Sequence, residues 1–285
     1  MENKTFKYLT YGFALACCIL FWLSIFQCNV QAADKYQIIN VTEETHKVGG
    51  VTFSSQYSDG KWHVYYQKNN EKKKLISNMN SSTVLMTNGK NVYYQNEEST
   101  GYLYTGKIYK MNLSTGKSQH ICSVSGVDYL EFAGIDSNNL YYVKDLDPGA
   151  LYSSNFRTGL HKKLLDNVTG ATQYGSVFLC TPYEGAGGPL QLQVYNTKTG
   201  HGKQISNGMI GYRVIKNKIY YVECIKENDF NDYTCNVIRC DMNGKHKKIL
   251  LKNRRMGVIK KITSKYVTTY SDFDGKTHKY IFSNK

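Results

Sequence analysis

The sequence predicts an all-β fold, a six-bladed β-propeller, because two features recur along the chain with one shared period. The first feature is an aromatic pair inside a strand-like segment, and successive copies lie 41, 48, 36, 43 and 47 residues apart. Blades of about 40 to 50 residues with four short strands each are typical of β-propellers. The copies, named by the second residue of each pair, are Phe53, Tyr94, Tyr142, Phe178, Tyr221 and Thr268.

The second feature is a turn glycine that lies downstream of the aromatic pair in four repeats. Gly116, Gly159, Gly200 and Gly244 follow one another at intervals of 43, 41 and 44 residues. Two landmarks that do not depend on each other therefore share one period. A β-sandwich, the alternative all-β fold, contains similar hairpins but gives no reason for a fixed period.

The repeat is clearest in residues 217–250, which read as three antiparallel strands. A β-branched and aromatic strand, IYYVEC, precedes a polar ten-residue loop at 225–234 and a second strand, CNVIRC. The Asn243-Gly244 pair then predicts a tight hairpin turn, because such turns need positive φ angles. The third strand ends at Leu250.

The other blades are expected to follow the same order, with residues 36–41 as the first strand of blade one. Blade six is one strand short of four, so either the ring closes incompletely or residues 36–41 belong to the last blade. The strands expected in blade two are 84–87, 91–95, 107–111 and 119–123, and those in blade six are 258–263, 266–270 and 277–282.

The stretch IYYVEC…VIRCDMNGKHKKIL resembles the YWTD propeller repeat of low-density-lipoprotein-receptor-related proteins. It is more similar still to a bacterial family of unknown function with a propeller domain like that of these receptors. The resemblance covers residues 36–285, although Tyr220-Tyr221-Val222-Glu223 stands where the Tyr-Trp-Thr-Asp tetrad would be. It implies a six-bladed propeller and an extracellular domain, and it implies no activity.

Residues 1–32 are expected to be an export signal, followed by one propeller domain at 33–285. Lys4 and Lys7 precede an apolar run at 11–26, and Val30-Gln31-Ala32 fits a cleavage site. The alternative is an uncleaved N-terminal helix that anchors the chain to the membrane. With 31 lysines and only five arginines, the composition is typical of a low-GC Gram-positive bacterium.

The charges are expected to separate between the two faces of the propeller. The chain carries a net charge of +14, yet the loops between the second and third strands hold eleven acids and only four lysines. The turns at the opposite end are rich in lysine, at Lys72–Lys74, Lys117, Lys162, Lys163, Lys203, Lys245, Lys247 and Lys248. This basic face favours an anionic cell-wall polymer or a membrane surface as partner, whereas export and the scarcity of arginine argue against nucleic acid.

No catalytic motif, metal-ligand spacing or cofactor-binding motif is found, so the sequence favours a secreted or surface-tethered, non-catalytic binding module. Its ligand, an unknown protein or glycan, would bind to the acidic and aromatic loop face. The alternative is a polysaccharide hydrolase or lyase that uses two carboxylates of this face. The candidate binding residues are Trp62, Glu97, Glu98, Tyr102, Tyr104, Asp145, Asp147, Tyr183, Glu184, Asp229, Asp232, Tyr233, Asp272 and Asp274.

The mature chain has five cysteines, an odd number that forbids complete internal pairing. In the expected hairpin Tyr221 faces Ile238, so Cys224 faces Cys235. Directly opposed Cβ atoms lie ~4.5–5.5 Å apart, close to the ~3.5–4.5 Å of a disulfide. We therefore predict a Cys224–Cys235 disulfide in an exported chain, with two free thiols as the alternative.

Overall fold

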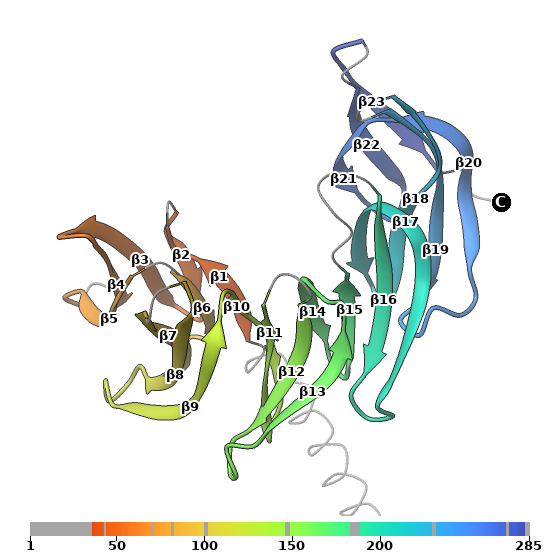
Figure 1. The fold of residues 1–285 in the computed structure, drawn as a ribbon. Coiled ribbons are helices and arrows are strands. Elements are labelled where there is room, and N and C mark those ends of the chain that lie inside the picture. Colours follow the sequence, from red (N-terminus) through yellow and green to blue (C-terminus); the bar gives the residue numbers. More distant parts are fainter. Residues whose placement is uncertain are drawn as a thin grey trace, which may run out of the picture. The chain divides into compact units, whose positions relative to one another are not determined.

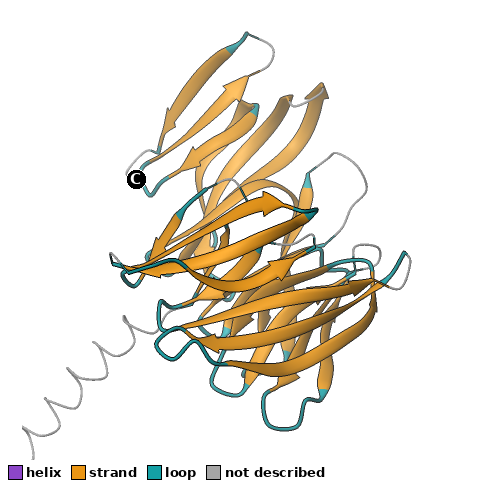
Figure 2. Ribbon diagram, turned by 90° about the vertical axis from the view of Figure 1, so that its left-hand side faces the viewer, coloured by secondary structure: helices purple, strands orange, loops and turns teal. Residues whose placement is uncertain are grey.

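The computed structural model describes residues 36–42, 44–69, 71–80, 83–99, 102–145, 149–182, 189–229, 232–271 and 274–282 (Figure 1). These residues form strands, turns and loops and contain no helix (Figure 2), which confirms the predicted all-β class. The predicted export signal or anchor at 1–32 lies outside the described residues. Within those residues, no helix is long and apolar enough to cross a membrane.

The chain divides into two compact units, of which the first comprises residues 1–97 and 107–121. Its first sheet is an antiparallel meander of four strands, as a propeller blade requires. The strands are β2 (His46–Val48), β3 (Val51–Ser58), β4 (Lys61–Lys68) and β5 (Lys74–Met79).

A five-stranded sheet corrects the expected position of the first strand. Its order is β1 (Gln37–Asn40), β6 (Val84–Thr87), β7 (Asn91–Ser99), β8 (Tyr104–Asn112) and β9 (Ser118–Val127). β1 pairs with β6 of blade two, with Ile39 opposite Leu85, and belongs neither to blade one nor to the last blade. Ile39 and Leu85 are buried in the same apolar cluster, which explains why the pairing is favourable.

The second unit comprises residues 98–106 and 122–285. Blades four and five share one continuous seven-stranded sheet, because β17 serves as the last strand of one and the first strand of the other. The four-stranded sheet consists of β10 (Leu130–Ile135), β11 (Asn139–Lys144), β12 (Ala150–Asn155) and β13 (His161–Asp166). The seven-stranded sheet consists of β14 (Gly170–Tyr174), β15 (Val177–Thr181), β16 (Leu190–Asn196), β17 (His201–Ile215), β18 (Lys218–Asp229), β19 (Asp232–Asp241) and β20 (Lys248–Met256). The last sheet has three strands, β21 (Val258–Ile262), β22 (Tyr266–Ser271) and β23 (Lys276–Ile281).

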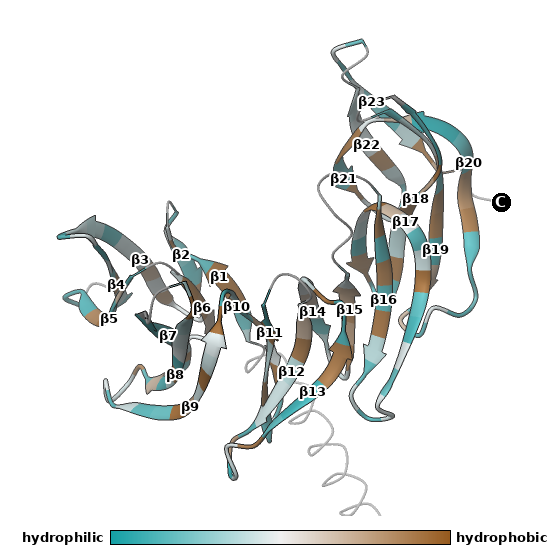
Figure 3. Cartoon of the chain, in the orientation of Figure 1, coloured by the Kyte–Doolittle hydropathy of each residue, from teal (hydrophilic) through white to brown (hydrophobic). Residues whose placement is uncertain are grey.

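The repeated aromatic position is buried wherever it holds an aromatic residue. The side chains at Phe53, Tyr94, Tyr142, Phe178 and Tyr221 are at most 5% exposed. In blade six Val267 is buried instead of its neighbour Thr268, so the repeat shifts by one residue there. Several inner strands, such as β11 and β15, are apolar and buried over consecutive residues, whereas β22 alternates between buried and half-buried positions; Figure 3 shows the hydropathy along each strand.

The repeated turn glycine has a conformational cause. Gly116, Gly159, Gly200 and Gly244 all have φ between 66° and 72°, a region that residues with a Cβ atom rarely adopt. The first three donate their N–H to the carbonyl four residues earlier, and Gly244 donates to Asp241. Asn243 is not left-handed, so the expected pair of positive φ angles at 243–244 is wrong; Lys216 and Asn217 form such a pair instead.

The β18–β19 hairpin has the predicted register but a much shorter loop. Tyr221 lies opposite Ile238, and Cys224 lies opposite Cys235. The strands continue beyond the cysteines, with two register irregularities, up to the pair Asp229 and Asp232, so the expected ten-residue loop is mostly strand. The β18 side of this extension, residues 225–228, is exposed and therefore accommodates polar side chains.

We predict that the exported, denatured chain contains three free thiols and one Cys224–Cys235 disulfide. In the structure both thiols are free, and burial raises the pKa of Cys235 to about 12 and also raises the pKa of Cys224. Thiols with raised pKa react slowly, so thiols must be counted after unfolding. Reduction should lower the stability by about 2–3 kcal/mol.

A Cys224→Ser variant is the control for this count. It should show four free thiols, because Cys235 then lacks its partner. Five free thiols in the wild-type chain recovered from an oxidising compartment would contradict the disulfide.

Candidate functional site

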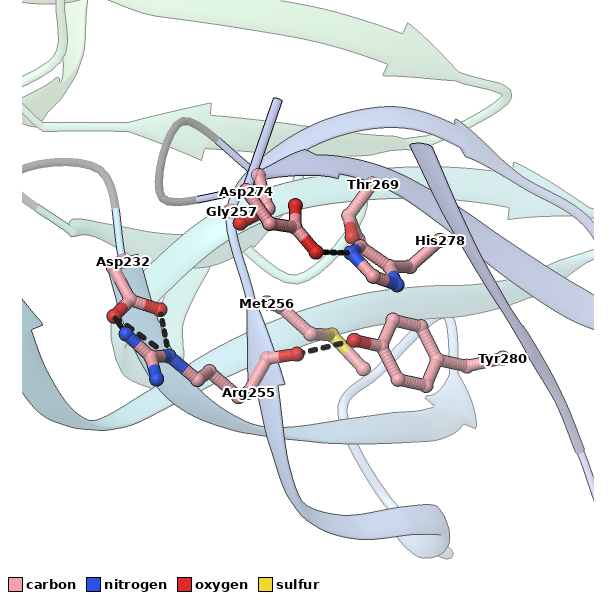
Figure 4. A pocket seen from close by; sticks show the side chains of 9 residues that line it. Asp232, Arg255, Met256, Gly257, Thr269, Asp274, His278 and Tyr280 are labelled. Carbon is pink, nitrogen blue, oxygen red and sulfur yellow. Dashed lines mark hydrogen bonds and ion pairs between the residues drawn. The ribbon is translucent and has the colours of Figure 1, made fainter. Parts of the chain in front are cut away.

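A pocket of about 220 Å³ lies between blades five and six, entirely within the second unit. It is formed where β19 begins, where β20 passes into β21, and where β22 and β23 meet their shared hairpin turn. Its lining residues are Asp232, Arg255, Met256, Gly257, Thr269, Ser271, Asp274, His278 and Tyr280 (Figure 4).

The pocket begins where the apolar packing between the two blades ends. On one face of β22 the residues are Val267, Thr269 and Ser271, since alternate residues of a strand share a face. Val267 is buried in an apolar cluster with Val222 and Val237 of blade five. The next two positions carry hydroxyl groups instead of apolar side chains, so the interface becomes polar towards the turn.

An ion pair fixes one wall of the pocket. Arg255 Nε donates to Asp232 Oδ1 at 3.0 Å and to Oδ2 at 2.8 Å, and its Nη2 donates to Oδ2 at 2.6 Å. The Asp232 side chain is 9% exposed and that of Arg255 56% exposed. This geometry holds both groups rigidly, because the planar guanidinium matches the carboxylate with several hydrogen bonds.

A second carboxylate is held by the turn between β22 and β23. Asp274 Oδ2 lies 2.8 Å from His278 Nε2, and Oδ1 accepts the Lys276 N–H at 3.1 Å. Partial burial opposes ionisation, but the hydrogen bonds from Lys276, His278 and Ser271 prevail and lower the pKa of Asp274. Asp274 is therefore a carboxylate at neutral pH.

Two hydroxyl groups complete the lining. Tyr280 donates its hydroxyl proton to the Arg255 carbonyl oxygen at 2.5 Å, and burial, followed by the charge of Asp274, raises its pKa. The Thr269 hydroxyl is fully buried and has no hydrogen-bond partner among the described residues. It lies near the Tyr280 phenol, but not in hydrogen-bonding geometry. Buried hydroxyls without partners are uncommon in folded proteins.

Of the predicted binding residues, the structure brings Asp232 and Asp274 together in this pocket. Tyr233 does not line it and instead packs against the apolar cluster beneath. Four candidates and one candidate side chain lie outside the described residues: Asp147, Tyr183, Glu184, Asp272 and the side chain of Asp229.

The remaining candidates do not line this pocket. In the first unit, Trp62 packs on Tyr57 with ring centroids 5.1 Å apart, and Glu97 accepts a hydrogen bond from Gln95 at 3.2 Å. In the second unit, Tyr102 is fully exposed, Glu98 is exposed and Tyr104 is half-buried.

Asp145 lies in the turn after β11 with a positive φ of 62°. It accepts the Asp128 N–H at 3.3 Å and pairs with Lys144 at 3.8 Å, while burial raises its pKa. Asp145 therefore closes the turn rather than facing the pocket described above.

Four pocket residues are not among the candidates, because they lie in strands and the candidates came mainly from loops: Arg255, Thr269, His278 and Tyr280. A usable signal was present in YVTTYS, where Val267, Thr269 and Ser271 alternate and a hydroxyl replaces the apolar residue expected at a buried position. The hairpin turn at Gly275 similarly places His278 next to Asp274. No comparable signal in the sequence points to Arg255.

Among the described residues, no group of three or more histidine, cysteine or acidic side chains could hold a metal ion.

No protein-family model matches the chain, and no curated protein matches it. Similar solved structures include TolB from Acinetobacter baumannii, which is 13% identical with a TM-score of 0.44 over 77% of this chain and 56% of that chain. Another is the β-propeller domain of the trilobed protease from Pyrococcus furiosus, at 11% identity and a TM-score of 0.49 over 88% of this chain and 84% of that one.

The third is an oligogalacturonate lyase in complex with manganese, at 10% identity and a TM-score of 0.51 over 88% of this chain and 87% of that one. This likeness shows a shared fold and nothing of the activity. The repeated antiparallel meanders have the form of propeller blades. The fold is of the β-propeller type. The chain spans about half the length of TolB and of a prolyl endopeptidase that it also matches.

Proposed function

We propose that this chain is a non-catalytic binding module, secreted or held at the cell surface by its N-terminal segment. Its ligand binds at the loop end of the blades, and the propeller has six blades, as in the receptor-related family that the sequence resembles. The observation that carries this proposal is the pocket between blades five and six, in which two predicted carboxylates meet hydroxyl, imidazole and guanidinium groups.

The state of the two carboxylates favours binding over catalysis. Glycoside hydrolysis with two carboxyl groups needs one that stays protonated to act as an acid. Asp274 has a lowered pKa, and Asp232 is fully engaged by Arg255. Asp274 is thus suited to accept hydrogen bonds from a ligand, and a polysaccharide hydrolase or lyase is the weaker proposal.

A second, basic surface supports an additional anionic partner, such as a cell-wall polymer or a membrane surface. In the first unit a shallow pocket of about 280 Å³ is lined by Lys110 and Lys117 with Asn91, Asn112, Ser118 and Gln119. Binding to this surface should weaken as salt rises, because exposed charges are screened over ~8–10 Å at physiological ionic strength.

The test of the binding function is a glycan array probed with the full chain. We expect retention of at least one glycan, and a loss of about tenfold or more in affinity for Asp274→Asn, because a charge-assisted hydrogen bond contributes ~1.5–3 kcal/mol. Asp166→Asn is the matched control, since Asp166 is an exposed carboxylate paired with Lys163 at 2.8 Å in blade three.

Mass spectrometry of the retained glycan distinguishes the two functions. An intact glycan after prolonged incubation supports a binding module. Shortened or unsaturated products that disappear with Asp274→Asn would overturn it in favour of the enzyme. Equal losses for Asp274→Asn and Asp166→Asn would show that the pocket is not the binding site.

A further inference from the structure

We infer that the pocket between blades five and six binds a single neutral, polyhydroxylated ring, one monosaccharide unit of a glycan. This inference rests on the proposed binding function and narrows its ligand to one chemical class. Four observations carry it: the size of the pocket, the balance of its charges, an unpartnered buried hydroxyl and a fixed aromatic ring.

The size limits the ligand to about one ring. The pocket measures about 220 Å³, below the ~300–1,000 Å³ of sites for drug-sized ligands. Two structural features restrict it. The Asp232–Arg255 pair fixes one wall, and the hairpin turn that carries Asp274 fixes the other. A longer glycan would therefore place one unit inside and extend its chain into solvent.

The charges argue against an anionic ligand. Arg255 already gives three hydrogen bonds to Asp232, so its positive charge is locally compensated. The Asp274 carboxylate is held by the backbone N–H of Lys276 and by the imidazole of His278, not by a lysine or arginine side chain in these contacts. A ligand carboxylate or phosphate would lie near both aspartates and be repelled, whereas neutral hydroxyl groups can donate hydrogen bonds to them.

The Thr269 hydroxyl points to a hydrogen-bonding ligand. It lines the pocket, is fully buried, and lacks a partner among the described residues. Val267, two residues earlier on the same face of β22, is an apolar side chain buried in the cluster below the pocket. The Thr269 hydroxyl gains its missing partner when a ligand hydroxyl enters the pocket.

Tyr280 and Met256 supply the apolar part of the site. The Tyr280 hydroxyl donates a hydrogen bond to the Arg255 carbonyl oxygen, which fixes the Tyr280 ring. The Tyr280 oxygen itself stays available as a hydrogen-bond acceptor. Met256 is buried beside it (Figure 4). A sugar ring presents C–H groups on its faces and hydroxyl groups on its edge, which matches this mixture of surfaces.

The test titrates the full chain with methyl glycosides of glucose, galactose and N-acetylglucosamine and with the matching uronic acid and amino sugar. We expect one neutral glycoside to bind, and its uronic acid counterpart to bind at least about tenfold more weakly. Thr269→Val should weaken the neutral glycoside by about five- to tenfold, without lowering the melting temperature of the free protein. Thr268→Val, on the opposite face of β22, should leave the affinity unchanged.

Each other result overturns the inference. Preference for the uronic acid or the amino sugar would contradict the charge argument. Equal effects of Thr269→Val and Thr268→Val would contradict the site. The wild-type chain could retain a glycan that the Asp274→Asn variant does not retain, while no monosaccharide competes with that glycan for binding. In that case the binding function stands and the single-ring inference fails. If no glycan depends on Asp274, both fail.

Discussion

A Gly257→Ala substitution should destabilise the second unit by about 3 kcal/mol, at the upper end of the range for overpacking. Gly257 links β20 to β21, and an added Cβ would lie 2.1 Å from the Tyr270 carbonyl oxygen and 3.0 Å from Ser271 Cα. Both atoms belong to the backbone of β22, which cannot move aside as a flexible side chain can. The pocket would be distorted with the sheet, since Gly257 and Ser271 both line it.

The measurement combines thermal unfolding with hydrogen exchange of the blade-six strands. A change of this size should lower the melting temperature by about 6–12 °C. Gly208→Ala is the matched control, because its added Cβ would make only an ordinary contact of 3.4 Å with the Cys224 carbonyl oxygen. Equal behaviour of the two variants would contradict the close approach.

Arg255→Met should cost about 2–3 kcal/mol, whereas Asp232→Asn should cost only about 1 kcal/mol. The difference follows from burial, because the Asp232 side chain is 9% exposed and the Arg255 side chain 56% exposed. Without Arg255 the carboxylate is left buried and unpaired, while without the carboxylate the guanidinium turns to solvent.

Chemical denaturation of both single variants and of the double variant checks this prediction. The double variant should be no less stable than Arg255→Met alone, because the unpaired charge is then absent. A larger loss for Asp232→Asn than for Arg255→Met would show that the pair is not organised around the buried carboxylate.

The aromatic pair and the turn glycine predicted the strands of most blades because both act locally. Glycine is the residue that adopts a positive φ most readily, as at Gly159 and Gly200. A hairpin register follows from the same local geometry, so the opposition of Cys224 and Cys235 was correctly predicted from Tyr221 and Ile238.

The pairing of β1 could not be predicted in this way. β1 and β6 are joined by the whole of blade one, so no turn fixes their register. The choice between partners depends on the apolar cluster that Ile39 and Leu85 enter together. The sequence identified residues 36–41 as a strand but not the strand with which they pair.

By itself, the sequence determined the all-β class, the repeat and the local hairpins, because these depend on backbone conformation and on residues close in the chain. Only the tertiary structure decided which carboxylates share a pocket, since Asp232 and Asp274 meet through the packing of blade five on blade six. It also decided their partners: Arg255 and Tyr280 lie in strands, where nothing in the sequence distinguishes a side chain that faces a pocket from one that faces solvent. That distinction arises from contacts between distant segments, which the order of residues along one strand does not contain.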